Sequence, residues 1–483
     1  MKIRTRMAPS PTGEFHVGSL RTLLYDYALA KGSGGEFILR IEDTDQSRYV
    51  EGSVERMVKV LKDYGLDWDE GPEVGGPYEP YYQSQRLDIY RKYAMELVEK
   101  GKAYYCFCDE ERLKNLREEQ HGKGLVSKYD KFCLSLSKEE VEKKLRDGTP
   151  YVIRLNVPSD ETIEFEDMVL GKLSFPSNDI DDQVLIKSDG FPTYHLAVVV
   201  DDHLMKITHI LRGREWLPST PKHVLLYKYF GWEMPKFVHL PLLRESDSTK
   251  KLSKRTGSVD AADFLREGYL PEALLNFIMF LGWNPGTERE VYSLEDFAKD
   301  FSIDKVQRSE MAAFDRKKLL WFNGLYIRNI SLEDLWGRVE KWHKEYSKEL
   351  KLDNFSYEYN LKILEMIRER MKTLSEFNDL SSYFYKKPKI EKETAKKFTG
   401  DISRSKEIIK NYLDTYENIS SENWNIDYLD KISHDKLEEF SYKPKEAFMT
   451  IRYVVTGCEF TPPLFDVLGV IGKKETIERM KKL

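Results

Sequence analysis

Apolar residues in the first part of the chain follow two spacings, which predict alternating strands and helices. Residues 2–6 form a short predicted strand. Residues 37–41 form another, in which Phe37, Leu39 and Ile41 alternate with Ile38, Arg40 and Glu42. Between them, apolar residues return at helical spacing: Leu20, Leu23, Leu24 and Tyr27. This order predicts an α/β sheet at the start of the chain.

Further elements continue this rhythm on both sides of an interruption. One helix starts at Ser53 as N-cap and stops at Gly65, and a second ends at Gly101. The rhythm breaks over about residues 105–190. We expect a strand at 184–186, a return to the sheet at 192–194 and a buried strand at 207–211. A helix capped by Ser219 or Thr220 then runs to Gly231, and from about residue 328 the pattern is almost wholly helical.

Composition narrows the class of protein. A chain of 483 residues is too long for one core, so roughly two to four domains are expected. No apolar run is long enough to span a membrane, and the four cysteines are too few for a disulfide framework. The first strand begins within a few residues, which leaves no room for a signal peptide, so we expect a cytoplasmic protein. A net charge of −6 argues against indiscriminate binding to nucleic acid, although a local basic stripe would still suit RNA.

Candidate chemistry begins at the turn between the first strand and the first helix. Two prolines and a glycine interrupt regular structure there, at Pro9, Pro11 and Gly13. His16 and Gly18 then fall at the helix start, where free backbone N–H groups favour an anion. Gly18 has no Cβ, so a flat ring or a phosphate can approach closely. The alternative is that the glycines only shape a tight turn.

A second stretch, residues 251–255, is basic and favours a functional role for the first stretch over a simple tight turn. Its sequence is Lys251-Leu252-Ser253-Lys254-Arg255. A lone basic run is usually a solvated loop, but the two stretches together resemble the HIGH and KMSKS signatures of class I aminoacyl-tRNA synthetases. Three further strings are similar to the bacterial glutamyl-tRNA synthetase family: residues 9–13, residues 40–45 and residues 194–202. The resemblance covers nearly the whole chain.

The resemblance implies a fold and a set of domains. We expect an α/β, Rossmann-like catalytic domain with an inserted acceptor-binding domain, followed by an all-α stem-contact and anticodon-binding region. The expected boundaries are 1–104 and 191–240 for the two catalytic halves, 105–190 for the insertion, 241–327 for the stem-contact domain and 328–483 for the helical anticodon-binding domain.

The implied activity is ATP-dependent attachment of L-glutamate to tRNA(Glu) through a glutamyl-adenylate, with ATP and Mg²⁺. Such chemistry depends on positioning and on stabilising charge on phosphate oxygens. His16, Lys251 and Lys254 suit that stabilising role. Gly18 would leave room for adenine, while Glu215 and the backbone of Leu243 would line the nucleotide pocket.

The resemblance also assigns residues to glutamate. Arginine suits a carboxylate and Glu42 suits the ammonium group. Arg6 is expected to be the main cause of a preference over glutamine. Val198 stands where some members have asparagine and can only shape the pocket. The expected glutamate-binding residues are Arg6, Ala8, Ser10, Glu42, Tyr194, Val198 and Arg212.

Three cysteines lie in the expected insertion, at Cys106, Cys108 and Cys133. Some family members bind zinc there with a Cys-x-Cys and a Cys-x-His. Ser135 stands where that histidine would be, and His121 has no fixed spacing to replace it, so four tetrahedral donors are not evident. We predict no metal, and three reduced, partly buried thiols in its place. The alternative is a zinc site completed by His121.

The sequence leaves several alternatives for the tRNA that is charged and for the type of protein. In the family an arginine on the C-terminal helices reads the third anticodon base, and Arg370 matches its position; alternatively Arg370 pairs with Glu369 at the surface. We expect an enzyme specific for tRNA(Glu), acting as a monomer without DNA or membrane partners. The alternatives are an enzyme that also charges tRNA(Gln), a synthetase that modifies a tRNA base, a glutaminyl-tRNA synthetase and a non-catalytic tRNA-binding paralogue.

Overall fold

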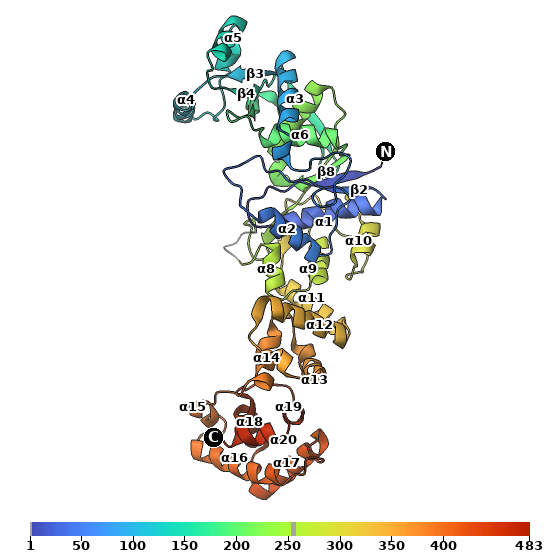
Figure 1. Ribbon diagram of the computed structural model, residues 1–483, viewed down its shortest axis with the longest axis vertical. Coiled ribbons are helices and arrows are strands. Elements are labelled where there is room, and N and C mark those ends of the chain that lie inside the picture. Colours follow the sequence, from blue (N-terminus) through green and yellow to red (C-terminus); the bar gives the residue numbers. More distant parts are fainter. Residues whose placement is uncertain (1, 253–256) are drawn as a thin grey trace. The chain divides into compact units, whose positions relative to one another are not determined.

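The computed structural model describes residues 2–252 and 257–483 (Figure 1). The chain divides into two compact units. The first comprises Met1–Asp263 and Leu274–Arg316, and the second comprises Phe264–Ala273 and Lys317–Leu483. No helix in the described parts of the chain is long and apolar enough to cross a membrane.

Parallel strands form the centre of the first unit. Strand β1 (Arg4–Met7) runs parallel to β2 (Glu36–Leu39), and β8 (His209–Gly213) runs parallel to β9 (Lys236–Leu240). The amide of Thr208 donates to the carbonyl of Arg4 at 3.0 Å, which places β8 beside β1. The carboxyl ends of β1 and β8 therefore share one edge, where doubly wound sheets place their ligands.

Two strands from residues 105–190 extend this sheet. Strand β5 (Thr162–Asp167) pairs with β6 (Gly171–Pro176) in antiparallel register. Its last residue, Asp167, also pairs with Phe237 of β9. The segment expected as an insertion thus reaches the catalytic sheet at Asp167.

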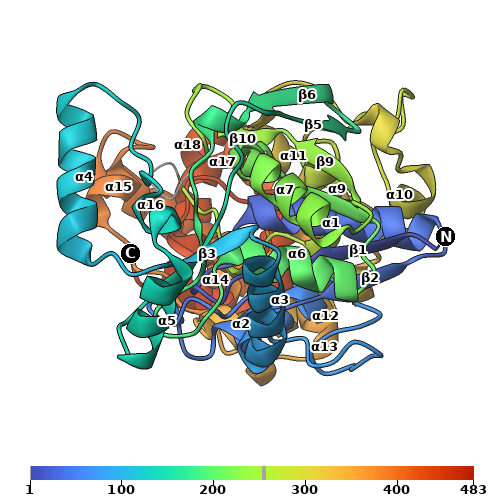
Figure 2. The ribbon, with the colours of Figure 1, turned by 90° about the horizontal axis from the view of Figure 1, so that it is seen from above.

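Helices cover the sheet and bury its apolar side chains. They are α1 (Val17–Gly32), α2 (Ser53–Asp63), α3 (Leu87–Glu99), α6 (Tyr194–Leu204) and α7 (Thr220–Phe230). Figure 2 shows α6 between α7 and α3. Helices α3, α6 and α7 bury Leu97, Val199 and Leu225 in one core with Phe237 of the sheet. Burial of such side chains is the main favourable term that holds these layers together.

A smaller antiparallel sheet lies within the same unit. It consists of β3 (Ala103–Cys106), β4 (Val152–Leu155) and β7 (Val184–Ile186), with α4 (Glu110–Gly122) and α5 (Lys138–Arg146) beside it. Farther along, β10 (Leu242–Glu245) runs parallel to β11 (Met311–Phe314), while α10 (Leu294–Asp300) packs against α1. This short pair adds two strands to a segment whose pattern is otherwise helical. Helices α8 (Ala261–Arg266) and α9 (Pro271–Met279) complete the region.

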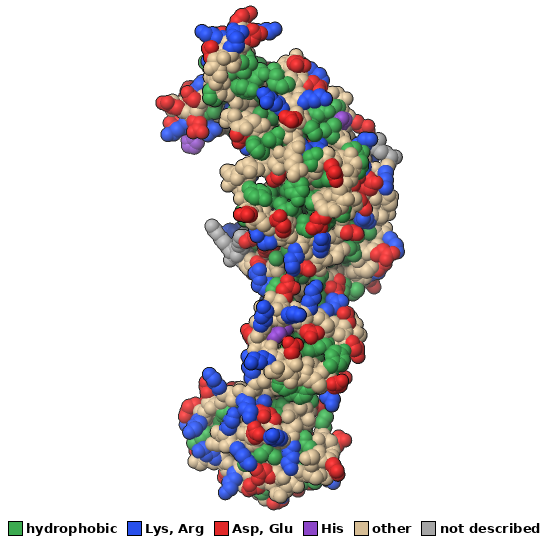
Figure 3. Space-filling view, viewed as in Figure 1, with side chains coloured by type: hydrophobic (Ala, Val, Ile, Leu, Met, Phe, Trp, Pro, Cys, Tyr) green, Lys and Arg blue, Asp and Glu red, His purple; other side chains and the backbone are tan. Residues whose placement is uncertain are grey.

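The second unit is helical throughout its described residues, as predicted from the pattern after residue 328. Its helices are α11 (Arg316–Asn329), α12 (Leu332–Trp342), α13 (Tyr357–Ile367), α14 (Glu376–Tyr385), α15 (Lys392–Lys396), α16 (Ile402–Glu417), α17 (Ile426–Phe440), α18 (Pro444–Thr456), α19 (Leu464–Ile471) and α20 (Lys473–Met480). Figure 3 shows Lys and Arg side chains interspersed with Asp and Glu over the visible face of these helices.

Some local predictions are wrong. Residues 37–39 are all buried and do not alternate, because β2 is covered on both faces as parallel strands usually are. Ser53 does not cap α2: its hydroxyl donates to the carbonyl of Pro11 at 3.0 Å, and Gly52 occupies the N-cap. Residue 194 begins α6 and does not return to the sheet.

The predicted start of α7 is right in position, but no side chain caps the helix. Ser219 occupies the N-cap without a side-chain capping bond, and the Thr220 hydroxyl bonds toward the sheet, at Arg212 and His239.

Candidate active site

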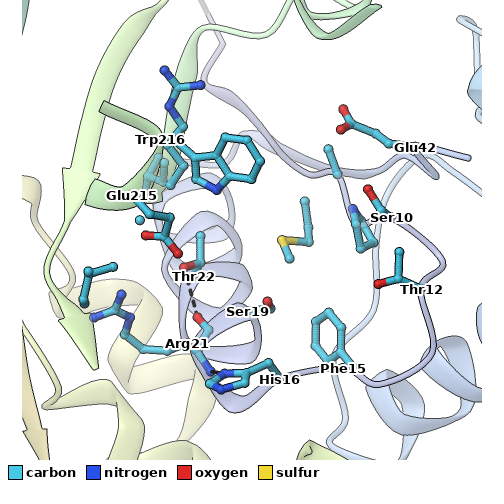
Figure 4. Close-up of a pocket in the computed structure, with 18 of the residues that line it drawn as sticks. Ser10, Thr12, Phe15, His16, Ser19, Arg21, Thr22, Glu42, Glu215 and Trp216 are labelled. Atoms are coloured by element: carbon cyan, nitrogen blue, oxygen red, sulfur yellow. Dashed lines mark hydrogen bonds between the residues drawn. The ribbon is translucent and has the colours of Figure 1, made fainter. Parts of the chain in front are cut away.

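One cavity of about 500 Å³ gathers the predicted site residues at the carboxyl edge of β1 and β8. Its lining includes Arg6, Ala8, Ser10, His16, Gly18, Glu42, Tyr194, Val198, Arg212, Glu215, Leu243 and Lys251. Figure 4 shows Ser10 and Glu42 on one side, Glu215 and Trp216 on the other, and His16 at the start of α1. Lys254 lies outside the described residues. The structure therefore brings together the predicted residues that it describes, Arg370 excepted.

His16 is the N-cap of α1. Its Nδ1 accepts a hydrogen bond from the amide of Gly18 at 2.9 Å, so the proton of the neutral ring lies on Nε2. Burial lowers the pKa of His16, and the charge of Lys251 lowers it further, whereas a backbone hydrogen bond with Leu252 opposes them. A Cβ on Gly18 would lie 3.1 Å from Nδ1 of His16, so glycine fits this close cap. The neutral ring therefore keeps an Nε2–H donor, which interacts with the backbone of Leu252.

Backbone pairing joins the two signature stretches. The amide of Val17 donates to the carbonyl of Val259 at 2.7 Å, and the amide of Leu252 donates to the carbonyl of Leu243 at 2.8 Å. The residues on both sides of 253–256 are thereby tied to the His16 turn and to β10. Lys251 Nζ lies 3.2 Å from Glu215 Oε1 at the same end of the cavity.

A buried cluster of charges lies beneath the opposite end. Arg6 binds both carboxylate oxygens of Asp202, at 3.1 and 3.3 Å. Arg40 donates to Asp202 at 2.8 Å and to Glu42 Oε1 at 3.1 Å. Burial is the largest influence on Arg6 and opposes its charge, but Asp202 and Asp26 together with Tyr194 outweigh it, and the pKa of Arg6 is raised.

Glu42 is the acid of this cluster nearest to the cavity. Burial raises the pKa of Glu42 to about 7, against the charges of Arg40 and Arg6. A cation placed beside it would favour ionisation, so the site suits an ammonium group.

The roles of Arg40 and Asp202 were missed from the sequence, although both stand in the strings that carry the resemblance. The signal available was a pair of aspartates, Asp201 and Asp202, directly after the apolar run 196–200. Charged side chains in such a run are buried only when they are paired.

Arg212 is also buried but has a different environment. Its partners are neutral: Nε donates to His239 Nε2 at 3.1 Å, Nη1 to the Tyr194 hydroxyl at 3.2 Å and Nη2 to Thr220 Oγ1 at 2.6 Å. Nη1 also lies 3.3 Å from Nδ1 of His223. Within the described residues, Arg212 forms no ion pair with a carboxylate, so its charge is available to an anionic ligand.

Trp216 is a further lining residue that the sequence did not indicate. Its ring centre lies 4.7 Å from that of Tyr194, and its side chain is part of the wall that Figure 4 shows. Val198 is buried in the wall and offers only an apolar surface.

The three cysteines of residues 106–133 converge. Their sulfur atoms lie within 4.8 Å of one another, with Cys106 and Cys133 buried. The hydroxyl of Tyr129 lies 3.2 Å from Cys108 Sγ. This set of soft donors fits a metal such as zinc in part.

Neither fourth ligand considered from the sequence completes the cluster. The Ser135 hydroxyl donates to the carbonyl of Phe132 at 2.7 Å, and His121 is exposed near the end of α4. Among the described histidines, cysteines and acidic residues, only three donors gather here. The absence of a metal stays a prediction.

Arg370 belongs to the second unit, in the turn Arg368–Arg370 that follows α13. It is exposed and forms no ion pair with Glu369 among the described residues. Burial lowers the pKa of Arg452, and the charge of Arg370 lowers it further. The charge of Arg370 therefore acts on Arg452 of α18 within the helical unit.

Comparisons with known proteins identify the family to which the chain is similar. A family model described as "tRNA synthetases class I (E and Q), catalytic domain" matches residues 2–321, and one for an anticodon binding domain matches residues 334–483. A glutamate–tRNA ligase from Clostridium tetani is 46% identical, with 99% of this chain and 97% of that protein covered. One from Clostridioides difficile is 44% identical over 99% and 98%.

A solved structure is similar over its full length. A glutamate tRNA ligase from Elizabethkingia meningosepticum, crystallised in complex with its amino acid, superposes with a TM-score of 0.87 at 37% identity. The alignment covers 100% of this chain and 99% of that one. The chain therefore belongs to the class I tRNA synthetases of the E and Q group.

Proposed function

We propose that the protein attaches L-glutamate to tRNA(Glu), using Mg²⁺-bound ATP as co-substrate. One observation carries the proposal: a single cavity has a neutral imidazole donor and a lysine at one end, and buried arginines and Glu42 at the other. The first end suits phosphates and the second suits a zwitterion with an additional carboxylate. The relatives are named glutamate–tRNA ligases, which supports glutamate and tRNA as the substrates.

The first step forms the adenylate. An oxygen of the glutamate α-carboxylate attacks the α-phosphorus of ATP, and the bond to the bridging oxygen breaks to release pyrophosphate. His16 Nε2–H and the charges of Lys251 and Lys254 stabilise the negative charge that builds on the phosphates. Glu215 and Leu243 line the nucleotide end of the cavity.

The second step transfers the glutamyl group. A terminal ribose hydroxyl of the tRNA attacks the activated carbonyl carbon, loses its proton, and AMP leaves with the electrons of the broken C–O bond. No protein nucleophile is needed in either step, so positioning carries the catalysis.

Selection of glutamate over glutamine rests on a buried cation that needs a counter-charge. The sequence pointed to Arg6, but Asp202 already pairs with Arg6. Arg212 has only neutral partners, which supports Arg212 as the residue that binds the side-chain carboxylate of the substrate. A neutral amide there would leave its charge unpaired, which is costly in a buried site.

We further infer that the helical unit reads the anticodon and that residues 105–190 hold the acceptor end. The exposed guanidinium of Arg370 supports this role, because sequence-specific RNA readers hydrogen-bond to splayed loop bases. The boundaries at 104, 190, 240 and 327 stay predictions, as do a monomeric state and a cytoplasmic location.

ATP–pyrophosphate exchange tests the enzyme. With glutamate, tRNA(Glu) and Mg²⁺ present, labelled pyrophosphate should enter ATP, and omission of glutamate should abolish the exchange. A protein that binds tRNA(Glu) but gives no exchange would be a binding paralogue.

A further inference from the structure

The guanidinium of Arg212 is held by two histidines from different elements. His239, on β9, accepts from Nε through its Nε2 at 3.1 Å. His223, on α7, lies with its Nδ1 3.3 Å from Nη1. Both histidines and Arg212 are buried, at 0%, 2% and 5% exposure. The contacts are therefore fixed by the fold and not by solvent.

The donor character of arginine fixes the tautomer of each ring. Arginine has five N–H donors and no acceptor, so each imidazole nitrogen that faces it must be unprotonated. His239 then carries its proton on Nδ1, which lies 2.7 Å from Asp167 Oδ2. His223 carries its proton on Nε2, which lies 3.1 Å from His195 Nδ1. The two rings thus have opposite tautomers, each fixed by a second partner.

Asp167 anchors one side of this arrangement. Its Oδ1 accepts the amides of Val169 and Leu170 at 2.9 and 2.8 Å, and its Oδ2 also accepts the amide of His239 at 3.1 Å. Burial opposes ionisation, but the hydrogen bond from the His239 ring, together with the amides of Leu170 and Val169, outweighs it and lowers the pKa of Asp167. Asp167 is the residue at which β5 joins β9, so the anchor is built into the sheet.

Both histidines are neutral. Burial lowers the pKa of His223 well below its usual value, and burial also lowers the pKa of His239 although the bond to Asp167 opposes it. Neutral rings orient the guanidinium without cancelling its charge. A carboxylate in the same place would cancel it, as Asp202 does for Arg6.

We propose that His239 and His223, held in opposite tautomers by Asp167 and His195, are positioning residues that aim the uncompensated guanidinium of Arg212 at the substrate's side-chain carboxylate. The proposal rests on the proposed function, since it assumes glutamate as the ligand of Arg212. The two histidines act indirectly, because they fix the plane of the guanidinium. Their loss should therefore weaken the binding of glutamate and leave the binding of ATP unchanged.

Paired amide substitutions test the two tautomers. The oxygen of glutamine can replace Nε2 of a histidine, and that of asparagine can replace Nδ1. His239→Gln should therefore keep more glutamate affinity than His239→Asn, and His223→Asn more than His223→Gln. Loss of one acceptor on a charged donor should raise the KM for glutamate about 10- to 100-fold, with the KM for ATP unchanged. Direct calorimetric titration with L-glutamate gives the same ranking without turnover.

A matched control is available on α6. His203 stacks on Trp232 with ring centres 3.8 Å apart and lies outside the cavity, so His203→Gln should leave the KM for glutamate unchanged. Equal effects of Asn and Gln at both positions, or parallel changes in the KM for ATP, would overturn the proposal. Thermal melting of each variant separates unfolding from a specific effect.

A spectroscopic measurement keeps the proposal falsifiable if the variants do not fold. In the wild type with ¹⁵N-labelled histidine, ring nitrogen shifts should show His239 as the Nδ1–H and His223 as the Nε2–H tautomer. The reverse tautomer at either ring refutes the proposal. The exchange assay on the wild type separately decides the proposed function, because absence of glutamate-dependent exchange would refute that function and leave the tautomers unaffected.

Discussion

The amide of Gly18 donates to Nδ1 of His16 at 2.9 Å, so one ring nitrogen caps α1. The other carries the Nε2–H, which also interacts with the backbone of Leu252 and is the donor that we assign to the ligand. The two roles can be separated by substitution. His16→Asn retains an acceptor for the Gly18 amide but loses the Nε2–H donor, whereas His16→Ala loses both. We expect adenylate formation to fall about 10²- to 10³-fold in both variants.

Stability should distinguish the same two variants. Only the alanine variant should lose about 1 kcal/mol of unfolding free energy, because only it lacks a cap. Chemical denaturation and pyrophosphate exchange on the pair measure the two effects. Near-normal exchange by His16→Asn would show that Nε2 has no part in the reaction.

Glu42 should make glutamate affinity depend on pH. With a folded-state pKa of about 7, it must lose a proton to pair with the substrate ammonium. Affinity should therefore rise as pH increases toward 7 and then level off, with proton release seen by calorimetry in buffers of different ionisation enthalpy. Glu42→Gln should bind weakly and without this pH dependence, and a flat wild-type profile between about pH 5.5 and 8 would contradict the assignment.

The same residue predicts a trend in stability without ligand. The unfolded chain ionises Glu42 at its ordinary pKa of about 4.5, whereas burial raises the pKa to about 7 in the folded chain. The free energy of unfolding should then fall as pH rises through this window, by at most about 1.4 kcal/mol per pH unit from this group. Subtracting the profile of Glu42→Gln isolates the contribution.

Arg6 and Arg212 should respond differently to the same substitution. Arg212→Gln should reduce the preference for glutamate over glutamine, with a small change in melting temperature because its partners are neutral. Arg6→Gln leaves Asp202 without one of its cations and should cost about 3–5 kcal/mol of stability. Exchange assays with both amino acids and melting curves compare the two. The account of Arg212 fails if its variant keeps the full preference.

Lys254 should act on the phosphates. Lys254→Ala is expected to slow adenylate formation about 10²- to 10³-fold while glutamate binding changes little. Lys250→Ala, at an exposed lysine four residues earlier, is the control. Near-normal exchange by the Lys254 variant would rule out this role.

Much of this site could be predicted because residues that are close together in the sequence form its turn. The prolines and glycine before His16 identify a strand-to-helix turn, and the basic stretch 251–255 completes the pair of signatures. The partners of Arg212 could not be predicted in that way. Asp167 and His239 are 72 residues apart and meet only where β5 joins β9. Contacts of this kind depend on strand pairing, which hydrophobic spacing does not determine.

The burial of Arg40 was missed for a related reason. Residues 37–41 were expected to alternate, which would place Arg40 toward solvent. In the structure both faces of β2 are covered, and Arg40 is neutralised by Glu42, two residues along the chain, and by Asp202 of α6. Periodicity describes a half-buried strand and fails for one that is buried on both faces.

Arg370 should control the choice of tRNA. Arg370→Ala is expected to reduce the difference between the charging rates of tRNA(Glu) and tRNA(Gln). The KM for ATP should not change, because Arg370 lies in the helical unit and not in the cavity. Lys372→Ala removes an exposed cation two residues away and should leave the difference in charging rates unchanged. Identical behaviour of both variants would show that only general charge matters there.

Charging of purified tRNA(Glu) and tRNA(Gln), side by side with labelled glutamate and with labelled glutamine, tests the central claim most directly. The account predicts that the wild-type protein loads glutamate onto tRNA(Glu), loads little onto tRNA(Gln), and loads glutamine onto neither. Equal loading of the two tRNAs would contradict the proposed specificity. Failure to load glutamate onto either tRNA, with Mg²⁺ and ATP present, would contradict the proposed function itself.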